Sequence, residues 1–469
     1  MTRSTNWRWG LLLAVLAAAA LWLGWVGFIA SDDSLYYAGA MRWLTDPPFA
    51  GDTHWSTRFP LTLTFAAVLT VMGQGFAAFA ATAVLFYAAI IAVTGLYAAK
   101  VGGQRAGWIS ALLTATMPVI VSHATTVSVD LLEASALLLG ALLVSGATAT
   151  WRGVAAGACF GVAVLCRETS LLPIVGLAPL FLLGRPVPRR ILIASGIGFL
   201  LVIGGEALFQ YAMTGDPLRR YAIAFHHDEH IDRAANMEGN FLLHPAIDPL
   251  LVLLVNDDFG LLFWLGGAAV AFGALRGISA EGRKRLIVLS AMALASFVLV
   301  SVLYSKLVLN PRYFTLPALV AAIVLAMWLD RIAPRWRALL LAAVVGSNLL
   351  LMSVGNAHPR WEMEALVDAA RAHPAQTVIG DENDVRRAAL PLGFAGQQNI
   401  ASGAPQPGVL LVAREDQSPV GTVIARYPSP PTRLGGILRG LGLEPFVPAP
   451  VAHRMFAPSP PVVLVRTPR

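Results

Sequence analysis

Charged residues are scarce in this sequence. Asp, Glu, Lys and Arg make up 13% of the 469 residues, whereas hydrophobic residues make up 57%. A soluble domain cannot bury that much apolar surface, so the composition excludes an ordinary soluble protein and indicates an integral membrane protein. The first apolar run is not followed by an Ala-x-Ala-like cleavage site. We therefore interpret residues 9–29 as a retained membrane helix rather than a removed signal peptide.

Cysteine is equally scarce. The chain has two, Cys159 and Cys166, which lie seven residues apart in one apolar run. On a helix they share a face but lie about 10 Å apart, which is too far for a disulfide. They are interpreted as thiols of the protein core, and they do not indicate a redox compartment.

Long hydrophobic runs dominate what is present. Hydropathy predicts membrane spans at 9–29, 76–98, 107–123, 130–149, 191–211, 259–275, 286–304, 313–329 and 338–355. If the N-terminus is inside, the short cytoplasmic connections hold 15 basic and two acidic residues, and the opposite connections hold eight basic and fifteen acidic ones. The positive-inside rule therefore predicts a cytoplasmic N-terminus, with the acidic connections facing the periplasm or exterior.

The apolar stretch 153–183 is broken at "CRETS". Its two flanks are both predicted to be cytoplasmic, so the chain must cross outward and return. Two helices, 153–166 and 170–183, would then meet at Arg167 and Glu168 near the outer side. Each is only about 20 Å long, which is tolerated where broken helices line a protein cavity. The predicted fold is an all-α polytopic membrane protein with about eleven transmembrane helices.

Residues 356–469 differ in composition. The segments "TVIGDEN", "GVLLVAR", "GTVIARY" and "PVVLVRT" are typical of strands, Pro and Gly separate them, and a helical pattern "WEMEALVDAARAH" precedes them. We expect a membrane domain over 1–355 and a small extracytoplasmic α/β domain over 356–469, which contains no catalytic motif.

Polar side chains gather at the predicted outer membrane boundary. They are Asp32, Asp33, His54, Arg58, Asp130, Glu133, Arg167, Glu168, Lys306 and Arg312. Single charges at an interface commonly anchor helix ends, and we assign that role to Lys306, Arg220 and Glu133. The set as a whole points to a functional site, because ionisable groups in a membrane are costly and usually serve one.

The stretch "SDDSLYY" follows the first apolar run directly. Ser31 can cap a helix over about 32–44, and Asp32 and Asp33 would lie in its first turn. The two carboxylates either serve only the helix terminus, or hold a divalent cation and accept a proton from a hydroxyl group. Tyr36 shares their helix face. Residues 61–72 are too short to span a membrane and predict a helix lying along the outer surface.

The order of these motifs resembles the polytopic C-type glycosyltransferases (GT-C) that use polyprenyl-phosphate sugars, the superfamily of dolichyl-phosphate-mannose-protein mannosyltransferases and aminoarabinose transferases. The resemblance covers about residues 9–330 and has two departures: an Asp-Asp pair replaces Asp-Glu, and Arg167 replaces a common Lys. The motifs that carry it are "DDSLY" (32–36), "RFPL" (58–61), "VSVDLLEASALLLG" (127–140), "GVAVLCRETSLL" (161–172), "YAMTGDPLRRY" (211–221) and "NPRYFTLPALVAAI" (310–323).

The resemblance implies an inverting glycosyltransferase of the bacterial inner membrane. It would move a sugar from a polyprenyl-phosphate donor to an envelope acceptor, a glycolipid, polysaccharide or protein, on the outer face. Asp32 would orient or deprotonate the acceptor, and Asp33 or Asp130 would assist or bind metal. The remaining assignments are Arg167, Arg312 and the weaker candidate Arg58 at the donor phosphate, and Tyr36, Tyr37, His54, Glu168 and Tyr313 as substrate-binding residues.

Three alternatives stay open. "FHHDEH" (225–230) offers a divalent metal site in which His226 and His230 share a helix face and Asp33 could contribute, or it is a solvated loop that orders over substrate. A secondary transporter also needs broken helices and intramembrane charges, but the sequence has no internal repeat and its charges gather at one face. A non-catalytic envelope-assembly protein is the third alternative, although the longest predicted outer loop spans only residues 212–248.

Overall fold

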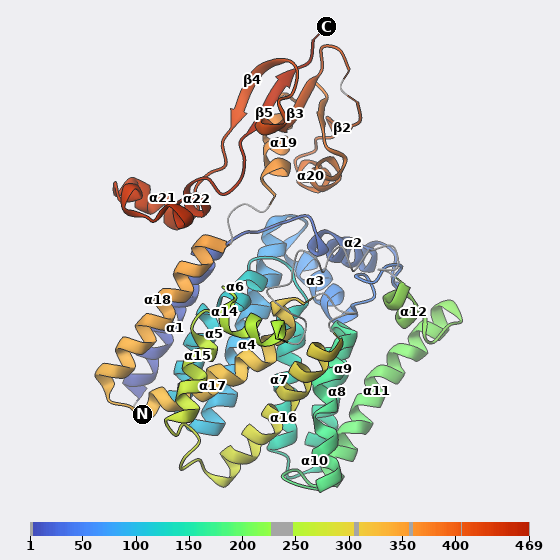
Figure 1. Cartoon of the computed structure of the whole chain (residues 1–469). Coiled ribbons are helices and arrows are strands. Elements are labelled where there is room, and N and C mark those ends of the chain that lie inside the picture. Colours follow the sequence, from blue (N-terminus) through green and yellow to red (C-terminus); the bar gives the residue numbers. More distant parts are fainter. Residues whose placement is uncertain (1–2, 227–246, 304–308, 356–359, 405, 469) are drawn as a thin grey trace.

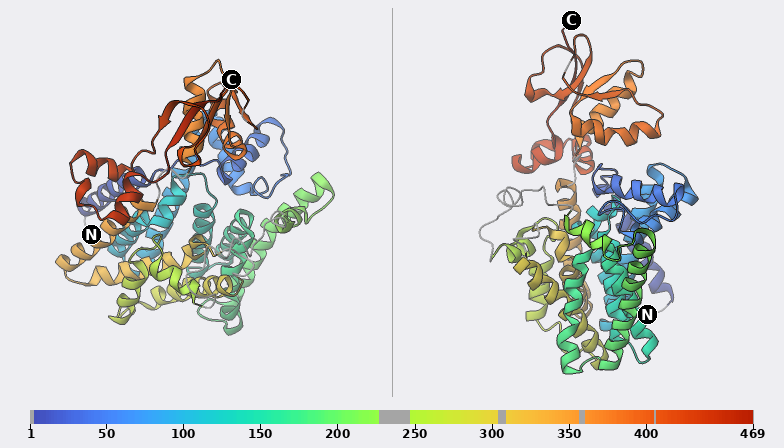
Figure 2. Two further views of the ribbon diagram at one scale, coloured as in Figure 1. Left: turned by 45° about the horizontal axis from the view of Figure 1, so that its top comes forward. Right: turned by 90° about the vertical axis from the view of Figure 1, so that its right-hand side faces the viewer.

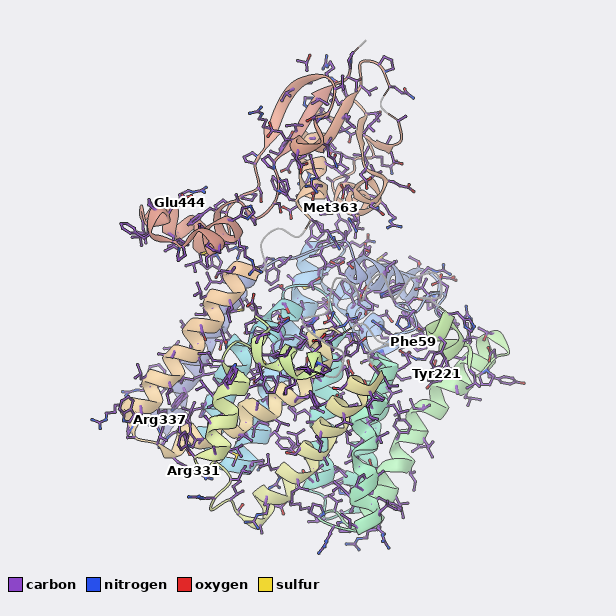
Figure 3. All side chains as sticks on the ribbon, viewed as in Figure 1. Phe59, Tyr221, Arg331, Arg337, Met363 and Glu444 are labelled. Atoms are coloured by element: carbon purple, nitrogen blue, oxygen red, sulfur yellow. The ribbon has the colours of Figure 1, made fainter. Side chains whose placement is uncertain are left out.

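The computed structural model describes residues 3–226, 247–303, 309–355, 360–404 and 406–468. Helices form one large body, and a small sheet domain stands at one end of it (Figure 1). We call that end the sheet side. Figure 3 labels Arg331 and Arg337, two arginines of a predicted cytoplasmic connection, at the opposite end.

The chain is a multi-pass integral membrane protein. Six helical segments among the described residues are long and apolar enough to span a membrane. They are Asn6–Gly24 within α1 (Arg3–Gly24), α4 (Phe76–Gly102), α11 (Arg189–Thr214), α16 (Ala280–Leu303), Pro311–Arg331, which comprises η2 (Pro311–Phe314) and α17 (Thr315–Arg331), and Pro334–Val354 within α18 (Pro334–Gly355).

A seventh candidate span is bent. The helices α5 (Gln104–Thr116) and α6 (Pro118–Ala124) meet at 63°. Met117 between them is extended, with φ −69° and ψ 124°, because the ring of Pro118 disfavours helical geometry in the residue before it.

Seven of the eleven predicted passes coincide with these candidates. The other four coincide with shorter helices, as was predicted for 153–166 and 170–183. They are α7 (Asp130–Ser145), α8 (Thr150–Cys166), the segment Glu168–Leu183 and α15 (Leu262–Ala271). The segment Glu168–Leu183 consists of η1 (Glu168–Ser170), α9 (Leu171–Val175) and α10 (Leu177–Leu183).

Short helices lie along the sheet side of this body (Figures 1 and 2). They are α2 (Asp32–Thr45), α3 (Phe59–Met72), α12 (Arg219–His226) and α14 (Asp248–Val255). The predicted helices at 32–44 and 61–72 are therefore present. The predicted cap is wrong, because the Ser31 side chain makes no capping hydrogen bond to α2.

The sheet domain has five strands in the order β2-β1-β3-β5-β4. Pairing is parallel between β1 and both β2 and β3, and antiparallel between β5 and both β3 and β4. The strands are β1 (Val378–Gly380), β2 (Ile400–Ser402), β3 (Leu410–Arg414), β4 (Thr422–Tyr427) and β5 (Val462–Arg466). The four predicted strand segments contain β1, β3, β4 and β5, while the short β2 was not predicted.

Helices accompany these strands. They are α19 (Trp361–Ala372), α20 (Glu382–Phe394), α21 (Arg433–Gly440) and α22 (Ala449–Phe456), with the single turns η3 (Glu415–Gln417) and η4 (Glu444–Phe446). The sheet domain touches the loop that precedes α2, because Ala30 and Phe28 pack in the core beneath α19. Arg360 Nε also donates a hydrogen bond of 3.1 Å to the carbonyl of Ile29.

Candidate active site

The two adjacent aspartates at the start of α2 have different surroundings. Asp33 is 1% exposed. Its carboxylate accepts hydrogen bonds from the backbone N–H of Ser31 (2.7 Å), Ser34 (2.9 Å) and Ile29 (2.8 Å), and from the Thr126 hydroxyl (3.3 Å). Burial raises the pKa of Asp33, and these hydrogen bonds partly offset the rise. Asp33 therefore fixes the loop before α2, and Ser31, the predicted cap, contributes only its backbone N–H to this arrangement.

Asp32 is half-buried, and none of the other described residues donates a hydrogen bond to its carboxylate. It lines a cavity of about 290 Å³ together with His123, Ser128, Asp130 and Arg312. The cavity joins the loop before α2 to the starts of α7 and η2, which lie far apart in the sequence. Asp32 is thus the carboxylate of the pair whose oxygens are available to a ligand.

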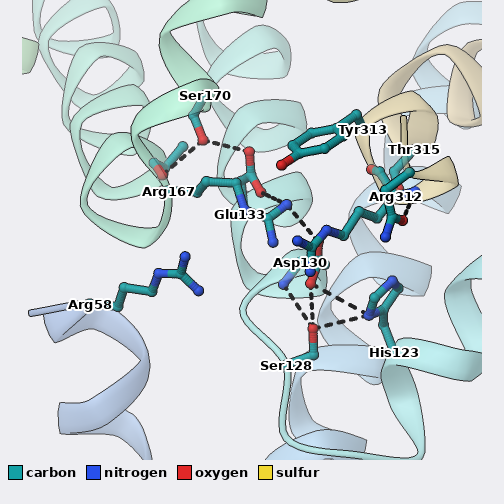
Figure 4. Close-up of polar contacts among 12 residues, drawn as sticks. Arg58, His123, Ser128, Asp130, Glu133, Arg167, Ser170, Arg312, Tyr313 and Thr315 are labelled. Carbon is teal, nitrogen blue, oxygen red and sulfur yellow. Dashed lines mark hydrogen bonds and ion pairs between the residues drawn. The ribbon is translucent and has the colours of Figure 1, made fainter. Parts of the chain in front are cut away.

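Arg167 lies where the α8 helix ends and η1 begins. Its backbone is extended there, with φ −155° and ψ 131°. The guanidinium group contacts Asp130 at 2.7 Å and Glu133 at 3.3 Å, both from the first turn of α7. All three residues are largely buried, and Figure 4 shows them together. The break between the two short helices thus places a cation against two carboxylates.

Further polar groups fix the two carboxylates of α7. Ser128 Oγ donates to Asp130 at 2.5 Å, and His123 Nδ1 lies 3.4 Å from the same carboxylate. The Ser170 hydroxyl donates to Glu133 at 2.6 Å. Asp130 is therefore held by three neighbours and is a fixed part of the site rather than a mobile side chain.

Arg312 lies on the other side of this cluster, in η2. Among the described residues no carboxylate forms an ion pair with it, and its buried Nε has no hydrogen-bond partner. The Tyr313 ring lies 5.5 Å from the Arg312 guanidinium carbon and 5.6 Å from that of Arg167. The aromatic ring is attractive to both cations, which allows two like charges to lie near each other.

A second, smaller cavity adjoins this ring. Its volume is about 30 Å³, and it shares Asp130 and Arg312 with the larger cavity. Its other lining includes Arg167 and Tyr313, and apolar side chains of α7, α16 and α17 such as Leu137, Val300 and Leu316. The two cavities thus share Asp130 and Arg312, and the smaller one lies among the membrane helices.

Arg58 approaches the cluster from the start of α3 (Figure 4). Its guanidinium group hydrogen-bonds to the Tyr36 hydroxyl and lies 2.6 Å from His54 Nε2. Burial raises the pKa of Tyr36 to about 12, so its phenol stays protonated at neutral pH. Tyr37 points elsewhere: its hydroxyl donates to Gln74 and its ring stacks on Phe79 at 5.3 Å.

Glu168 is tied to a residue that sequence reasoning treated as an anchor. Arg220 is fully buried, and its Nη2 lies 2.8 Å from Glu168 Oε1. The same guanidinium group donates to the carbonyls of Thr57 and Leu165. Arg220 therefore joins the segment before Arg58 to the segment before Arg167 and fixes the two arginines relative to each other.

The metal prediction falls mostly outside the described residues. His226 is described and is exposed at the end of α12, whereas His230 and the rest of that motif lie outside, as does Lys306. Among the described residues there is no group of three or more His, Cys, Asp or Glu side chains that could hold a metal ion. A divalent cation stays a prediction.

The structure brings together most of the predicted site residues. Asp32, Asp130, Arg167, Arg312 and Tyr313 line the two connected cavities, while Tyr37 lies in an aromatic core. Sequence reasoning missed His123, Ser128 and Ser170 and undervalued Glu133 and Arg220. For Ser128 and Glu133 a signal was present, since both lie within three residues of Asp130 in the quoted motif.

Part of the chain matches a model of a known protein family. Residues 59–210 match the family model described as dolichyl-phosphate-mannose-protein mannosyltransferase. This match confirms the resemblance over that part of the chain. A search of proteins with curated functions found no similar sequence.

Two solved structures share the fold over nearly the whole chain. ArnT from Cupriavidus metallidurans in the apo state aligns with a TM-score of 0.58 at 14% identity, covering 90% of this chain and 97% of that chain. ArnT bound to undecaprenyl phosphate aligns with a TM-score of 0.59 at 15% identity, covering 97% and 98%. The chain has an ArnT-like, GT-C fold.

An oligosaccharyltransferase from Archaeoglobus fulgidus, in complex with Zn and sulfate, aligns with a TM-score of 0.52 at 14% identity. The alignment covers 81% of this chain and 61% of that chain, so this chain spans less than two thirds of the oligosaccharyltransferase.

Proposed function

From this fold and this site we propose that the chain is an inverting glycosyltransferase, which moves a sugar from a polyprenyl-phosphate donor to an envelope acceptor. The observation that carries the proposal is one cavity lined both by an available carboxylate, Asp32, and by an arginine without a carboxylate partner among the described residues, Arg312. Sugar transfer from a lipid phosphate needs both a proton acceptor and a cation for the leaving group.

The acceptor hydroxyl or amine is activated by Asp32. Its carboxylate accepts the proton as the acceptor atom forms a bond to the anomeric carbon. Asp33 is unsuited to this step, because backbone N–H groups already occupy both of its oxygens. The neighbouring pair thus divides into one reacting group and one that fixes the loop.

The leaving group is the polyprenyl phosphate. The bond between the anomeric carbon and the phosphate oxygen breaks as the new bond forms on the opposite face, so a single displacement inverts the configuration. Arg312 is placed to neutralise the charge that builds on the phosphate, since a guanidinium group can bind phosphate through two parallel hydrogen bonds. Arg58 offers a second cation from the opposite side (Figure 4).

Arg167, unlike Arg312, has carboxylates paired with it. Asp130 and Glu133 together compensate its guanidinium group, so its net attraction for phosphate is weaker than that of Arg312. We propose that Arg167 orients Tyr313, and through it Arg312, and that it contacts the phosphate only through its remaining N–H groups. The ring geometry, with both cations at about the same distance, supports this arrangement.

The lipid class follows from the small cavity and from the comparison. Its apolar lining lies between α7, α16 and α17 and directs a lipid tail toward the membrane interior. A space of about 30 Å³ is close to the volume of one water molecule, so donor binding requires side chains to move. The C. metallidurans relative of this fold was solved with undecaprenyl phosphate, which supports a polyprenyl carrier here.

We place the reaction on the outer face of a bacterial inner membrane. The positive-inside distribution supports this, because the basic connections lie opposite the sheet side, while the larger cavity is lined by the start of α2 and the loop before it. On this topology the four shorter apolar helices complete the eleven passes, with the sheet domain outside.

The test compares envelope material from three bacterial strains: a deletion strain, the same strain carrying the wild-type gene, and one carrying Asp32→Asn. Mass spectrometry of glycolipids, polysaccharides and glycoproteins should show one sugar missing from the deletion and Asp32→Asn strains and restored by the wild type. If all three strains carry the same sugars while the purified protein moves a solute across vesicles, the chain is a transporter instead.

A further inference from the structure

The segment 433–456 lies apart from the candidate active site. It contains α21, η4 and α22, and it lies at the sheet-side ends of α1 and α18 (Figure 1). Both α21 and α22 contact α18, and Figure 3 labels Glu444 within the segment. Its location is therefore where two membrane-spanning helices leave the bilayer.

The segment carries large apolar side chains on its surface. Phe446 is 80% exposed and Leu441 is 66% exposed, and Ile437 and Leu443 are also exposed. Leu434, Ile437 and Leu438 of α21 and Leu441 directly after it are spaced at i, i+3, i+4 and i+7, so they lie on one side of this turn-and-helix segment. In water this surface would be unfavourable, and a contiguous exposed apolar patch indicates a contact surface.

The contacts of α21 set its depth relative to the membrane. Arg433 donates a hydrogen bond to the carbonyl of Trp22, and its guanidinium carbon lies 5.6 Å from the Trp22 ring. Trp22 lies in the last turn of α1. Only 11% of the membrane-spanning residues of α1 are buried within the protein, so most of that helix faces lipid. Tryptophan near the end of a span marks the level of the lipid headgroups.

Cations surround the apolar residues. Arg439 pairs with Glu444 through two hydrogen bonds, and Arg454 lies 3.6 Å from Asp257, in the connection between α14 and α15. With Arg433 the segment has an excess of basic over acidic side chains. An apolar helix face bordered by arginines is typical of helices that lie in the plane of a membrane interface.

We propose that residues 433–456 insert their apolar side chains into the headgroup region of the leaflet on the sheet side. The occupant of this surface is lipid, because the surface continues the lipid-facing surface of α1 and α18. The contact with lipid holds the sheet domain at a second point, in addition to the hydrogen bond between Arg360 and Ile29. The two attachments together keep the sheet domain at a fixed distance from the loop that contains Asp33.

The experiment uses the full chain in nanodiscs of phosphatidylethanolamine and phosphatidylglycerol. Phe446→Cys is introduced with Cys159→Ser, since the other native cysteine, Cys166, is buried, and the new thiol is labelled with the environment-sensitive fluorophore NBD. Val420→Cys is the matched control, because Val420 is 75% exposed in the same domain, before β4, away from the segment. Quenching by spin-labelled phosphatidylcholine is compared with quenching by aqueous iodide.

The label at 446 should emit at shorter wavelength than the label at 420. It should also be quenched several-fold more by the spin-labelled lipid and several-fold less by iodide. Equal behaviour at both positions would overturn the proposal. A blue shift at 446 that disappears when each nanodisc holds one copy would also overturn it, in favour of a contact between copies. The measurement involves no sugar transfer, so its outcome is independent of the proposed function.

Discussion

The two adjacent aspartates should respond in opposite ways to the same substitution. Asp33→Asn replaces one acceptor oxygen by an NH₂ group, which then faces a backbone N–H of the loop 29–34 or the Thr126 hydroxyl. An unsatisfied buried donor costs about 1–3 kcal/mol, and two neighbouring donors are affected, so we expect a loss of about 2–6 kcal/mol in unfolding free energy. Asp32→Asn removes only a favourable interaction with the start of α2, about 0.3–1 kcal/mol.

Activity should show the reverse order. Asp32→Asn should lower sugar transfer by about 10²–10⁴-fold, the usual contribution of a general base, while the protein keeps its melting temperature. Asp33→Asn should lower the melting temperature by several degrees and leave substantial activity in the fraction that is folded.

The assay is thermal unfolding of purified protein, followed by intrinsic fluorescence in detergent, in parallel with transfer measured on the same preparations. The assignment of roles would be refuted if Asp33→Asn were as stable as the wild type, or if Asp32→Asn were the destabilised variant.

Substitutions at three other residues have distinct expected results. Arg220→Met should cost about 3–5 kcal/mol in unfolding free energy, because it leaves the Glu168 carboxylate without its buried partner, and Arg220→Lys should recover part of this in the same unfolding assay. Arg312→Met should lower kcat/KM by about 10²–10³-fold with little change in melting temperature, since none of the carboxylates described here loses a partner; unfolding of this variant would count against its role at the phosphate. Burial beside Asp257 raises the pKa of Asp258 to about 6 from an ordinary value of 3.8. The folded state therefore holds this proton more tightly, and stability should fall as the pH rises from about 4 through about 6. Asp258→Asn should be more stable than the wild type at pH 8 and no more stable at pH 4 by thermal unfolding, and equal curves at both pH values would contradict this.

Local patterns in the sequence were enough for much of the fold. The helix at α2 follows from the two carboxylates expected in its first turn, although the Ser31 cap is wrong. The surface helix α3 follows from the limited length of its apolar run. The strands β3 and β5 have an apolar sequence bounded by Pro and Gly. Short β2 has no such signal, since its three residues depend on parallel pairing with β1. Hydropathy marked where the apolar runs lie but not how long each helix is, because it measures composition and not the residue at which helical hydrogen bonding stops.

The site was predictable in its membership but not in its division of roles. Charge at one membrane boundary was sufficient to group Asp32, Asp130, Arg167 and Arg312. The sequence did not indicate that the chain before α2 turns back so that its N–H groups occupy Asp33. Arg220 was undervalued for a similar reason, since its partners Thr57, Leu165 and Glu168 become its neighbours only after three segments pack together.

The most direct test of the account measures release of the lipid carrier. Purified wild-type protein and Asp32→Asn are each mixed with a lipid extract from the deletion strain, together with its envelope acceptors, and free polyprenyl phosphate is quantified by mass spectrometry over time. The account predicts that the wild type releases polyprenyl phosphate as a sugar appears on the acceptor, and that Asp32→Asn does so at least about 10²-fold more slowly. Release at the wild-type rate by Asp32→Asn, or no release by either protein, would contradict it.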